Sequence, residues 1–139
     1  MADIVVTAAQ VGRVYPDKDC VVSGILAATV TAGQVLYLTT SGTWDLADGS
    51  LTGTAQCRAL ALRGGGAGQS VEIMRYGWVY GYTLSQAYDA ALYLSDTAGA
   101  MADANGTVNV VVGRVDAMTD ADKTKVVYFF GATPNLQYT

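Results

Sequence analysis

Few residues of this sequence have the chemistry of a catalytic or metal site. The chain contains no histidine, which is the commonest general base, the usual partner of a catalytic serine or cysteine, and the commonest metal ligand. Its densest group of acids is Asp116, Asp120 and Asp122, which lacks the central glycine and the final glutamate of an EF-hand loop. We interpret these acids as solvated turn residues, with a weak calcium site as the alternative. The sequence therefore predicts no enzyme, no cofactor and no metal ion.

Two further features contain residue types that occur in functional sites, but their spacing is unsuitable. Cys20 and Cys57 lie too far apart for a CxxC metal or redox motif, and we expect two buried, reduced thiols. The glycine-rich run 63–70 has the composition of a phosphate loop. However, Gln69 stands where a Walker loop carries its lysine, and no helix is predicted to follow. We interpret the run as a turn between two strands.

Four aromatic residues alternate along one stretch of the chain, namely Tyr76, Trp78, Tyr80 and Tyr82. Successive side chains of a strand point to opposite faces, so this spacing places all four on one face. Such a face is typical either of a core or of a subunit interface, where stiff aromatic side chains order at low entropic cost. The sequence leaves both interpretations open.

The rest of the chain supplies the strands that must position this face. Short runs that alternate apolar with small or polar residues, separated by glycine-containing turns, predict many short strands. The expected strands are residues 11–15, 21–27, 35–39, 57–63, 70–75, 78–83, 91–95, 108–115 and 126–130. Short helical turns are expected at 85–90 and 119–123, and Asn105-Gly106 favours a type I′ hairpin. We therefore predict an all-β fold, a compact single-domain β-barrel or sandwich.

A weak internal repeat refines this prediction. Residues 33–39 and the turn and short strand after them are echoed by residues 91–95 and the segment that follows. In each copy a later Gly-Thr pair opens another apolar strand. Two copies are too few for a solenoid. The repeat instead predicts two related β-motifs packed into one barrel-like core.

Residues 1–16 stand apart as an extended N-terminal arm in front of a β-barrel-like domain of residues 17–139. The start of the arm is apolar and has no evident hairpin partner, and Pro16 closes the segment. Either the arm adds a strand to another chain, or it is an ordinary edge strand of its own domain. The candidate contact residues are Ile4, Val5 and Val6 of the arm and Tyr76, Trp78, Tyr80 and Tyr82 of the aromatic stretch.

The composition narrows the class of partner. Charged residues make up 14% of the chain and its net charge is −4, against about 25% charged residues in typical soluble domains. The basic residues are isolated from one another, which argues against a nucleic-acid partner. No apolar run approaches the roughly 20 residues that span a bilayer, and no basic region precedes the apolar N-terminus as in a secretory signal. We expect neither nucleic acid nor membrane as a partner, and the low charge suggests oligomerisation.

Several segments together resemble the small head decoration proteins, also called capsid cement proteins, of tailed bacteriophages. The similarity lies in residues 2–8, 31–38, 53–62 and 92–96. It covers most of the chain and rests on strand and turn patterns rather than on residues with a fixed chemical role.

The resemblance implies a virion protein that is made in the cytoplasm of the host bacterium and binds the outer surface of the mature capsid. Such proteins commonly form homotrimers and bridge neighbouring subunits of the major capsid protein. We expect the arm to carry the capsid contact, and a deletion of residues 2–10 to leave the domain folded. Two alternatives stay open: a tail-tube or fibre subunit, and a carbohydrate- or host-binding module that uses the aromatic stretch. An exposed aromatic face would favour the module, and a buried one would remove its main support.

Overall fold

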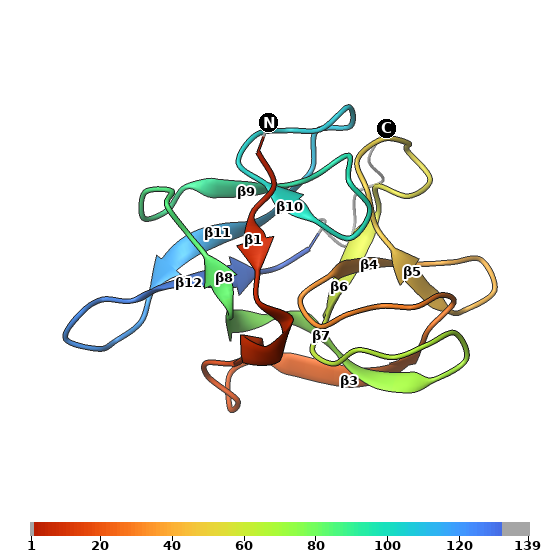
Figure 1. Cartoon of the computed structure of the whole chain (residues 1–139), viewed down its shortest axis with the longest axis horizontal. Helices are drawn as coiled ribbons and strands as arrows, with labels where there is room; N and C mark the ends of the chain where they lie inside the picture. Colours follow the sequence, from red (N-terminus) through yellow and green to blue (C-terminus); the bar gives the residue numbers. More distant parts are fainter. Residues whose placement is uncertain (1, 132–139) are drawn as a thin grey trace.

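The computed structural model describes residues 2–131, and these are built almost wholly of short strands and turns (Figure 1). The predicted all-β fold is therefore confirmed. The strands are β1 (Val5–Val6), β2 (Gly12–Arg13), β3 (Cys20–Ile25), β4 (Val35–Leu38), β5 (Trp44–Leu46), β6 (Cys57–Ala61), β7 (Ser70–Tyr80), β8 (Tyr82–Thr83), β9 (Ala91–Leu94), β10 (Met101–Ala102), β11 (Val111–Ala117) and β12 (Lys125–Phe129). Within the described range, the helical structure is limited to one 3₁₀ turn, η1 (Ala8–Gln10).

Three local predictions are wrong, and in each case the backbone φ angles explain why. Residues 85–90 and 119–123 form turns instead of helical segments. Each contains a non-glycine residue with positive φ, Asp89 at 67° and Lys123 at 51°, which a right-handed helix does not accommodate. Conversely, a type I′ turn needs positive φ at both central residues, and neither Asn105 nor Gly106 has it. This dipeptide lies in the longer loop between β10 and β11.

Ten of the strands form one curled antiparallel sheet. Its main path runs β10-β9-β11-β12-β7-β6-β4-β5, and β2 and β3 pair with β7 beside this path. Strands β1 and β8 form a separate two-stranded sheet. The eleven-residue strand β7 pairs with β12 near its end and with β6 near its middle. It therefore joins the β9–β12 half of the molecule to the β4–β6 half, on the left and right of Figure 1.

The predicted repeat corresponds to two β-motifs with the same register. In the first motif the hairpin β4–β5 is followed by β6 and β7, and in the second the hairpin β9–β10 is followed by β11 and β12. Strand β6 carries one extra residue, Arg58, where it pairs with β4, and β11 carries one extra residue, Val112, at the equivalent place against β9. A β-bulge at the same position in both copies shows a shared plan. Their last strands, β7 and β12, meet at the centre with Trp78 opposite Tyr128.

The buried apolar side chains form two clusters. The larger is lined by both motifs and contains Leu92 of β9 and Phe129 of β12, both fully buried. The smaller lies in the first motif and contains Trp44 of β5. Strand β7 serves both clusters, because its Ile73 packs in the smaller one and its Met74 in the larger one. The two motifs are thus tied together by one shared strand and one shared core.

The N-terminal segment runs across the seam between the two motifs and pairs with its own domain (Figure 1). Strand β1 pairs with β8, and β2 pairs with β7. The amide of Ile4 donates to the carbonyl of Met101 at 2.8 Å, and the Ile4 side chain, 6% exposed, belongs to the larger core. Of the two alternatives for this segment, the structure has the strand within its own domain. A deletion of residues 2–10 would remove the core side chain of Ile4, so we now expect it to destabilise the domain.

Candidate interaction surface

Three residues of the predicted aromatic face lie on the outside of β7. Tyr76 and Tyr80 are 48% and 46% exposed, Trp78 is half-buried, and Gly77 and Val79 between them are buried. The interpretation of this row as core therefore does not hold for Tyr76, Trp78 and Tyr80. We call these three residues the aromatic row.

Trp78, the central residue of the row, is held between two other aromatic rings. It stacks on Tyr128 of β12, with ring centroids 4.7 Å apart and planes 20° from parallel. Tyr15 meets Trp78 edge to face at 5.4 Å. The indole Nε1 donates to Oδ2 of Asp116 at 2.8 Å, which satisfies the polar group of a half-buried tryptophan. These contacts fix the indole in one orientation.

Sequence reasoning missed Tyr15 and Tyr128 as members of this surface. Tyr128 alternates with the buried Val127 and Phe129 along β12, so its outward direction was readable from the strand pattern. Its position beside Trp78 depends on the pairing of β7 with β12, which nothing local in the sequence specifies. Tyr15 reaches the same ring because β2 lies against β7.

Tyr82 does not share the outer face with the row, which corrects the sequence prediction. Strand β7 ends at Tyr80, and Gly81 takes a φ of +109°, a conformation that favours glycine and breaks the alternation. A Cβ on Gly81 would also lie 2.8 Å from the backbone of Val11. Tyr82 instead packs on the larger core and donates its hydroxyl to the carbonyl of Gly33 at 2.6 Å. Burial raises the pKa of Tyr82.

The three candidate residues of the N-terminal segment have different environments. Ile4 is buried in the core, so the isolated chain does not present its side chain for the expected capsid contact. Val6 is half-buried against Gly33, where an added Cβ would lie 2.5 Å from Cγ2 of Val6. Val5 is 63% exposed. Only Val5 of the three presents most of its side chain to a partner.

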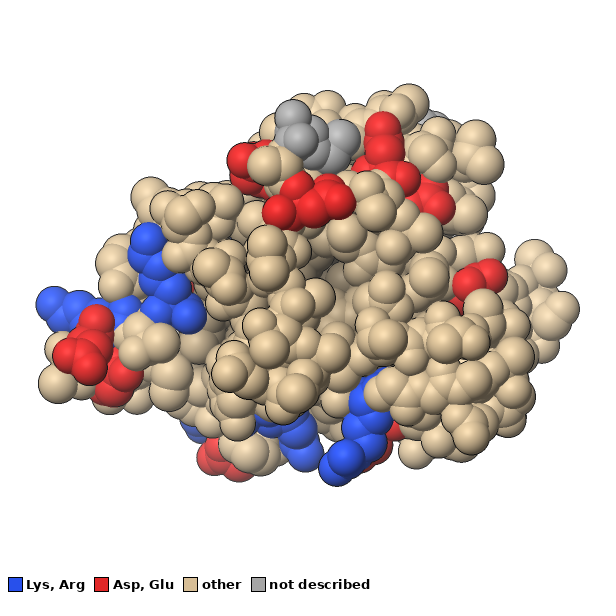
Figure 2. Space-filling view, viewed as in Figure 1, with Lys and Arg blue, Asp and Glu red and all other residues tan. Residues whose placement is uncertain are grey.

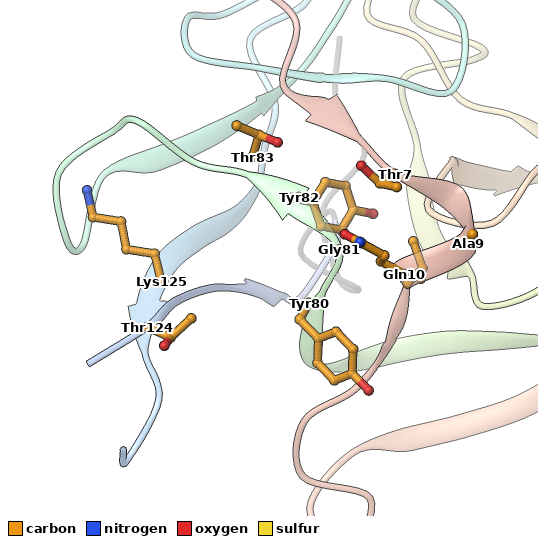
Figure 3. A pocket seen from close by; sticks show the side chains of 10 residues that line it. Thr7, Ala9, Gln10, Tyr80, Gly81, Tyr82, Thr83, Thr124 and Lys125 are labelled. Atoms are coloured by element: carbon orange, nitrogen blue, oxygen red, sulfur yellow. The ribbon is translucent and has the colours of Figure 1, made fainter. Parts of the chain in front are cut away.

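A groove of about 500 Å³ lies between the N-terminal segment, the end of β7 and the start of β12 (Figure 3). Thr7, Gln10 and Tyr80 are among its walls. Lys125 borders it but is held by other groups, because its Nζ donates to the carbonyl of Gln86 at 2.5 Å and lies 5.2 Å from the ring of Tyr88. The groove therefore offers hydroxyl and amide groups beside the aromatic row.

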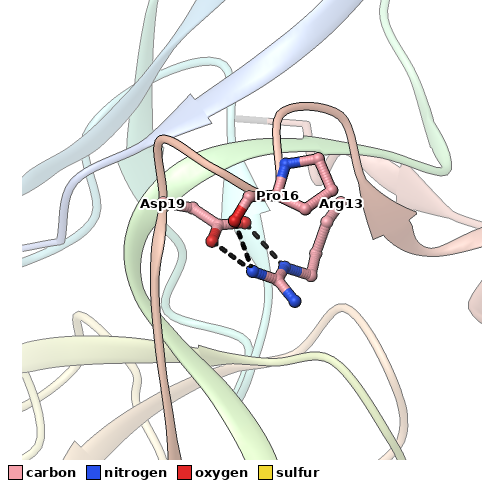
Figure 4. Close-up of polar contacts among 3 residues, drawn as sticks. All are labelled: Arg13, Pro16 and Asp19. Atoms are coloured by element: carbon pink, nitrogen blue, oxygen red, sulfur yellow. Dashed lines mark hydrogen bonds and ion pairs between the residues drawn. The ribbon is translucent and has the colours of Figure 1, made fainter.

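An ion pair fixes the loop that carries Tyr15 (Figure 4). Arg13 donates from Nε and Nη2 to the two carboxylate oxygens of Asp19, at 2.8 and 2.6 Å, and from Nη2 to the carbonyl of Pro16 at 2.9 Å. The Asp19 side chain is fully buried. Its hydrogen bond raises the pKa of Arg13, so the guanidinium stays charged. The two-point contact holds the loop in place beside the aromatic row.

Charged side chains lie at the margins of the face shown in Figure 2. Acids gather along the rim near the N-terminus, and lysines and arginines lie along the opposite rim and at one end. A broad central area that includes β1 is uncharged. The centre of this face therefore carries no charge of either sign.

The turn acids and thiols that the sequence singled out have local partners. Asp120 accepts hydrogen bonds from the amide and hydroxyl of Thr124, at 2.9 and 2.6 Å, and these bonds lower the pKa of its carboxyl. Within residues 2–131, no three His, Cys, Asp or Glu side chains are grouped so as to hold a metal ion. Both cysteines are free, with Cys20 half-buried and Cys57 fully buried. Burial raises the pKa of Cys57 to about 12.

In comparisons with known proteins, no protein-family model, curated protein or solved structure matches the chain. Among the described residues, no helix has the length and apolar character needed to cross a membrane.

Proposed function

We propose that this chain is a structural protein of a virion, which decorates and stabilises the mature capsid by bridging subunits of the major capsid protein. The observation that carries the proposal is the aromatic row on the outside of β7. Tyr76 and Tyr80 are about half exposed, and Trp78 between them is fixed by its neighbours. Tyrosine and tryptophan dominate the binding energy of protein interfaces. Residues that are already ordered lose little entropy on binding.

The physical basis of capsid stabilisation is mass action. A chain that binds only the mature lattice stabilises it by RT ln(1 + [L]/Kd) at each site. The contact at each site can be weak, because it is repeated over the whole shell. In this role the chain is a homotrimer on the outer capsid surface, as the resemblance implies, and needs neither a catalytic step nor a cofactor. The low charged fraction of the sequence is consistent with a largely apolar contact.

Sedimentation velocity tests the proposal directly. The purified chain is run alone and then mixed with undecorated, expanded capsids of the virus that encodes it. We expect a discrete oligomer that co-sediments with the capsids and saturates at a fixed number of copies per shell. A chain that remains free at all capsid concentrations would overturn the proposal. Open-ended polymers without capsid affinity would favour a tail-tube or fibre subunit.

A pair of variants connects the binding to the aromatic row. Tyr76→Ser with Tyr80→Ser removes two exposed rings without touching the core, and we expect the affinity for capsids to fall at least about tenfold. Tyr88→Ser is the matched control, because Tyr88 is 50% exposed and lies outside the row. Equal losses in the two variants would show that the row is not the contact.

A carbohydrate- or host-binding module is the second candidate. It is favoured by the exposure of Tyr76 and Tyr80 and by the groove of hydroxyl and amide groups next to Tyr80. Sugar rings stack on exposed aromatic faces while their hydroxyls bind such polar groups. A screen of host surface glycans by tryptophan fluorescence separates the two functions. Saturable binding to one glycan, lost with Tyr80→Ser, would favour the module.

A further inference from the structure

We infer that the outer edge of β3 is a docking site for β3 of a second copy of this chain, in an antiparallel pair with two-fold symmetry. This contact is separate from the aromatic row and goes beyond the proposed function. It would join the sheets of two molecules into one.

The free hydrogen-bonding groups of β3 follow from its register with β7. Leu26 N donates to the carbonyl of Gln69 at 2.9 Å, so the polar backbone groups of residue 26, and by alternation those of 24 and 22, face β7. Leu62 N donates to the carbonyl of Glu72, so the backbone polar groups of Glu72 face the β6 side of β7. They therefore do not bond to Ser23, which lies opposite Glu72 on β3. The N–H and C=O groups of residues 21, 23 and 25 thus point away from the sheet. Outside the strand ladders, the structure records no backbone hydrogen bond for these groups among residues 2–131.

The other outer edges of the sheet are covered by the chain itself. Asp3 bridges Ala102, so the N-terminal segment lies along β10. Ala27 N donates to the carbonyl of Trp44 at 2.7 Å, so the chain just after β3 lies along β5. Strand β2 is only two residues long and carries a charged arginine. Among the described strands, the six-residue β3 has the longest uncovered edge.

Strand β3 lacks the features that prevent pairing at sheet edges. Natural edge strands are protected by charged side chains, by proline or by being very short. The sequence of β3 is CVVSGI, without charge or proline. Its Val22 and Ile25 are 41% and 51% exposed. The register with β7 shifts once, between Cys20 and Val21 at the start of β3, and the uncharged edge beyond that point is a template for another strand.

A second copy of β3 fits this edge because the strand is complementary to itself. Antiparallel pairing centred on Ser23 places Val21 opposite Ile25 of the other copy and Ser23 opposite its own equivalent. This register uses all three outward residues, and each pair exchanges two N–H···O bonds. Moving the centre to Val22 or Gly24 leaves one outward residue unpaired. An apolar pair at each end adds to the stability of the ladder.

The flanking charges also favour the antiparallel arrangement. In an antiparallel pair, the turn before β3 that carries the exposed Asp17 and Lys18 lies at the opposite end of the ladder from the same turn of the other copy. A parallel pair would bring the two turns, with their like charges, to the same end. Like charges directly opposite one another destabilise a strand pair. The antiparallel two-fold contact avoids this repulsion and is isologous, the commonest kind in homo-oligomers.

Sedimentation equilibrium of the purified chain, over a concentration series without capsids, tests the inference. Ser23→Pro removes an N–H that the isolated fold does not use, and an edge strand tolerates proline at such a position. Ser23→Lys places two positive charges opposite each other in the pair. Ser41→Lys is the matched control, an exposed serine in the β4–β5 turn given the same charge.

We expect the wild type and Ser41→Lys to reach twice the molar mass of both Ser23 variants, with unchanged circular dichroism. A wild type whose mass equals that of the Ser23 variants at every concentration would overturn the inference. Because this difference is measured without capsids, it does not depend on the capsid proposal. Loss of capsid binding in the Tyr76 and Tyr80 variant bears on that proposal alone.

A disulfide tests the geometry even if Ser23→Pro fails to fold. In the two-fold pair the Cα atoms of the two Ser23 residues lie about 5.5 Å apart, within the range that a disulfide spans. In a Cys20→Ser background, Ser23→Cys should oxidise to a covalent dimer, and Ser41→Cys should not. Cys57 does not interfere, because it is fully buried and its pKa is raised. Equal cross-linking at both positions would contradict the two-fold contact.

Discussion

The chain treats two outer edges of its sheet, those of β10 and β3, differently. At β10, residues 2–4 lie along the strand, and this contact also buries the side chain of Ile4. At β3, the outward backbone groups of residues 21, 23 and 25 have no partner among the described residues. The two motifs follow one plan, with a bulge at the same place, and the chain covers the equivalent hairpin strand of each: residues 2–4 lie along β10, and residues 26 and 27 lie along β5. Strand β3, which belongs to neither copy, keeps its outer edge uncovered among the described residues and available to another molecule.

The largest loss of stability is expected from a change in the core that both motifs share. Phe129 is fully buried in the larger cluster, so Phe129→Ala should lower the free energy of unfolding by about 3–5 kcal/mol. Urea unfolding followed by circular dichroism should still show one transition, because the motifs share β7 and this core. Phe130→Ala, at the half-buried next position, is the control and should cost less than half as much. Two separate transitions would mean that the motifs fold independently.

The next largest loss of stability is expected where the N-terminal segment covers the edge of β10. Ile4→Ala should lower the free energy of unfolding by about 2–5 kcal/mol, toward the lower end because Ile4 lies near the surface. Val5→Ala, at a site that is 63% exposed, should stay within about 0.5 kcal/mol of the wild type. Hydrogen exchange at Met101 and Ala102 should become faster in Ile4→Ala. Equal stability of the two variants would indicate that the segment does not hold the β10 edge.

A pH effect distinguishes the two motifs at equivalent positions, where the first has Cys57 and the second has Val111. Burial raises the pKa of Cys57 to about 12, whereas an unfolded thiol has a pKa of about 8.5. The unfolded state therefore loses a proton first as the pH rises. The stability from this group is complete below the unfolded pKa and is lost between it and the folded pKa, by about 1.4 kcal/mol per pH unit.

Urea unfolding from pH 7.5 to 9.5 measures this slope before tyrosines titrate. Cys57→Ala should lower the overall stability but remove most of the decline with pH. If wild type and Cys57→Ala decline in parallel, another group carries the pH dependence.

The smallest effect is expected at the surface near β3. Arg63 and Glu72 form an ion pair at 2.9 Å, with side chains 74% and 46% exposed. Such pairs contribute about 0–1 kcal/mol and are screened by salt. Arg63→Ala should therefore shift the urea midpoint slightly in low salt and not at all in high salt. A large, salt-independent loss would show that this part of the first motif depends on Arg63 for packing.

Local patterns in the sequence were enough for the all-β fold and the repeat. Alternation of apolar and small residues marks strands because side chains of a strand point to opposite faces. The repeated Leu-Tyr-Leu run lies in β4 and β9, and the bulges opposite it confirm the duplication. Errors arose where backbone conformation overrides composition, as with positive φ at Asp89 and Lys123 and its absence at Asn105.

The interaction surface could be predicted only in part. Alternation places Tyr76, Trp78 and Tyr80 on one face, but whether that face is inside or outside depends on which side of β7 the core occupies. Tyr82 leaves the row because Gly81 turns the chain, and Ile4 is buried because the segment folds back on β10. These features depend on contacts between residues far apart in the sequence, which no local pattern records.

The most direct test of the central claim is hydroxyl-radical footprinting of the chain, free and bound to expanded capsids. Oxidation of Tyr76, Tyr80 and Tyr88 is read by mass spectrometry, since the three are similarly exposed in the free chain, at 48%, 46% and 50%. We expect capsids to suppress oxidation of Tyr76 and Tyr80 several-fold and to leave Tyr88 unchanged. Suppression at Tyr88 with none at Tyr76 and Tyr80 would contradict the assignment of the aromatic row as the capsid contact.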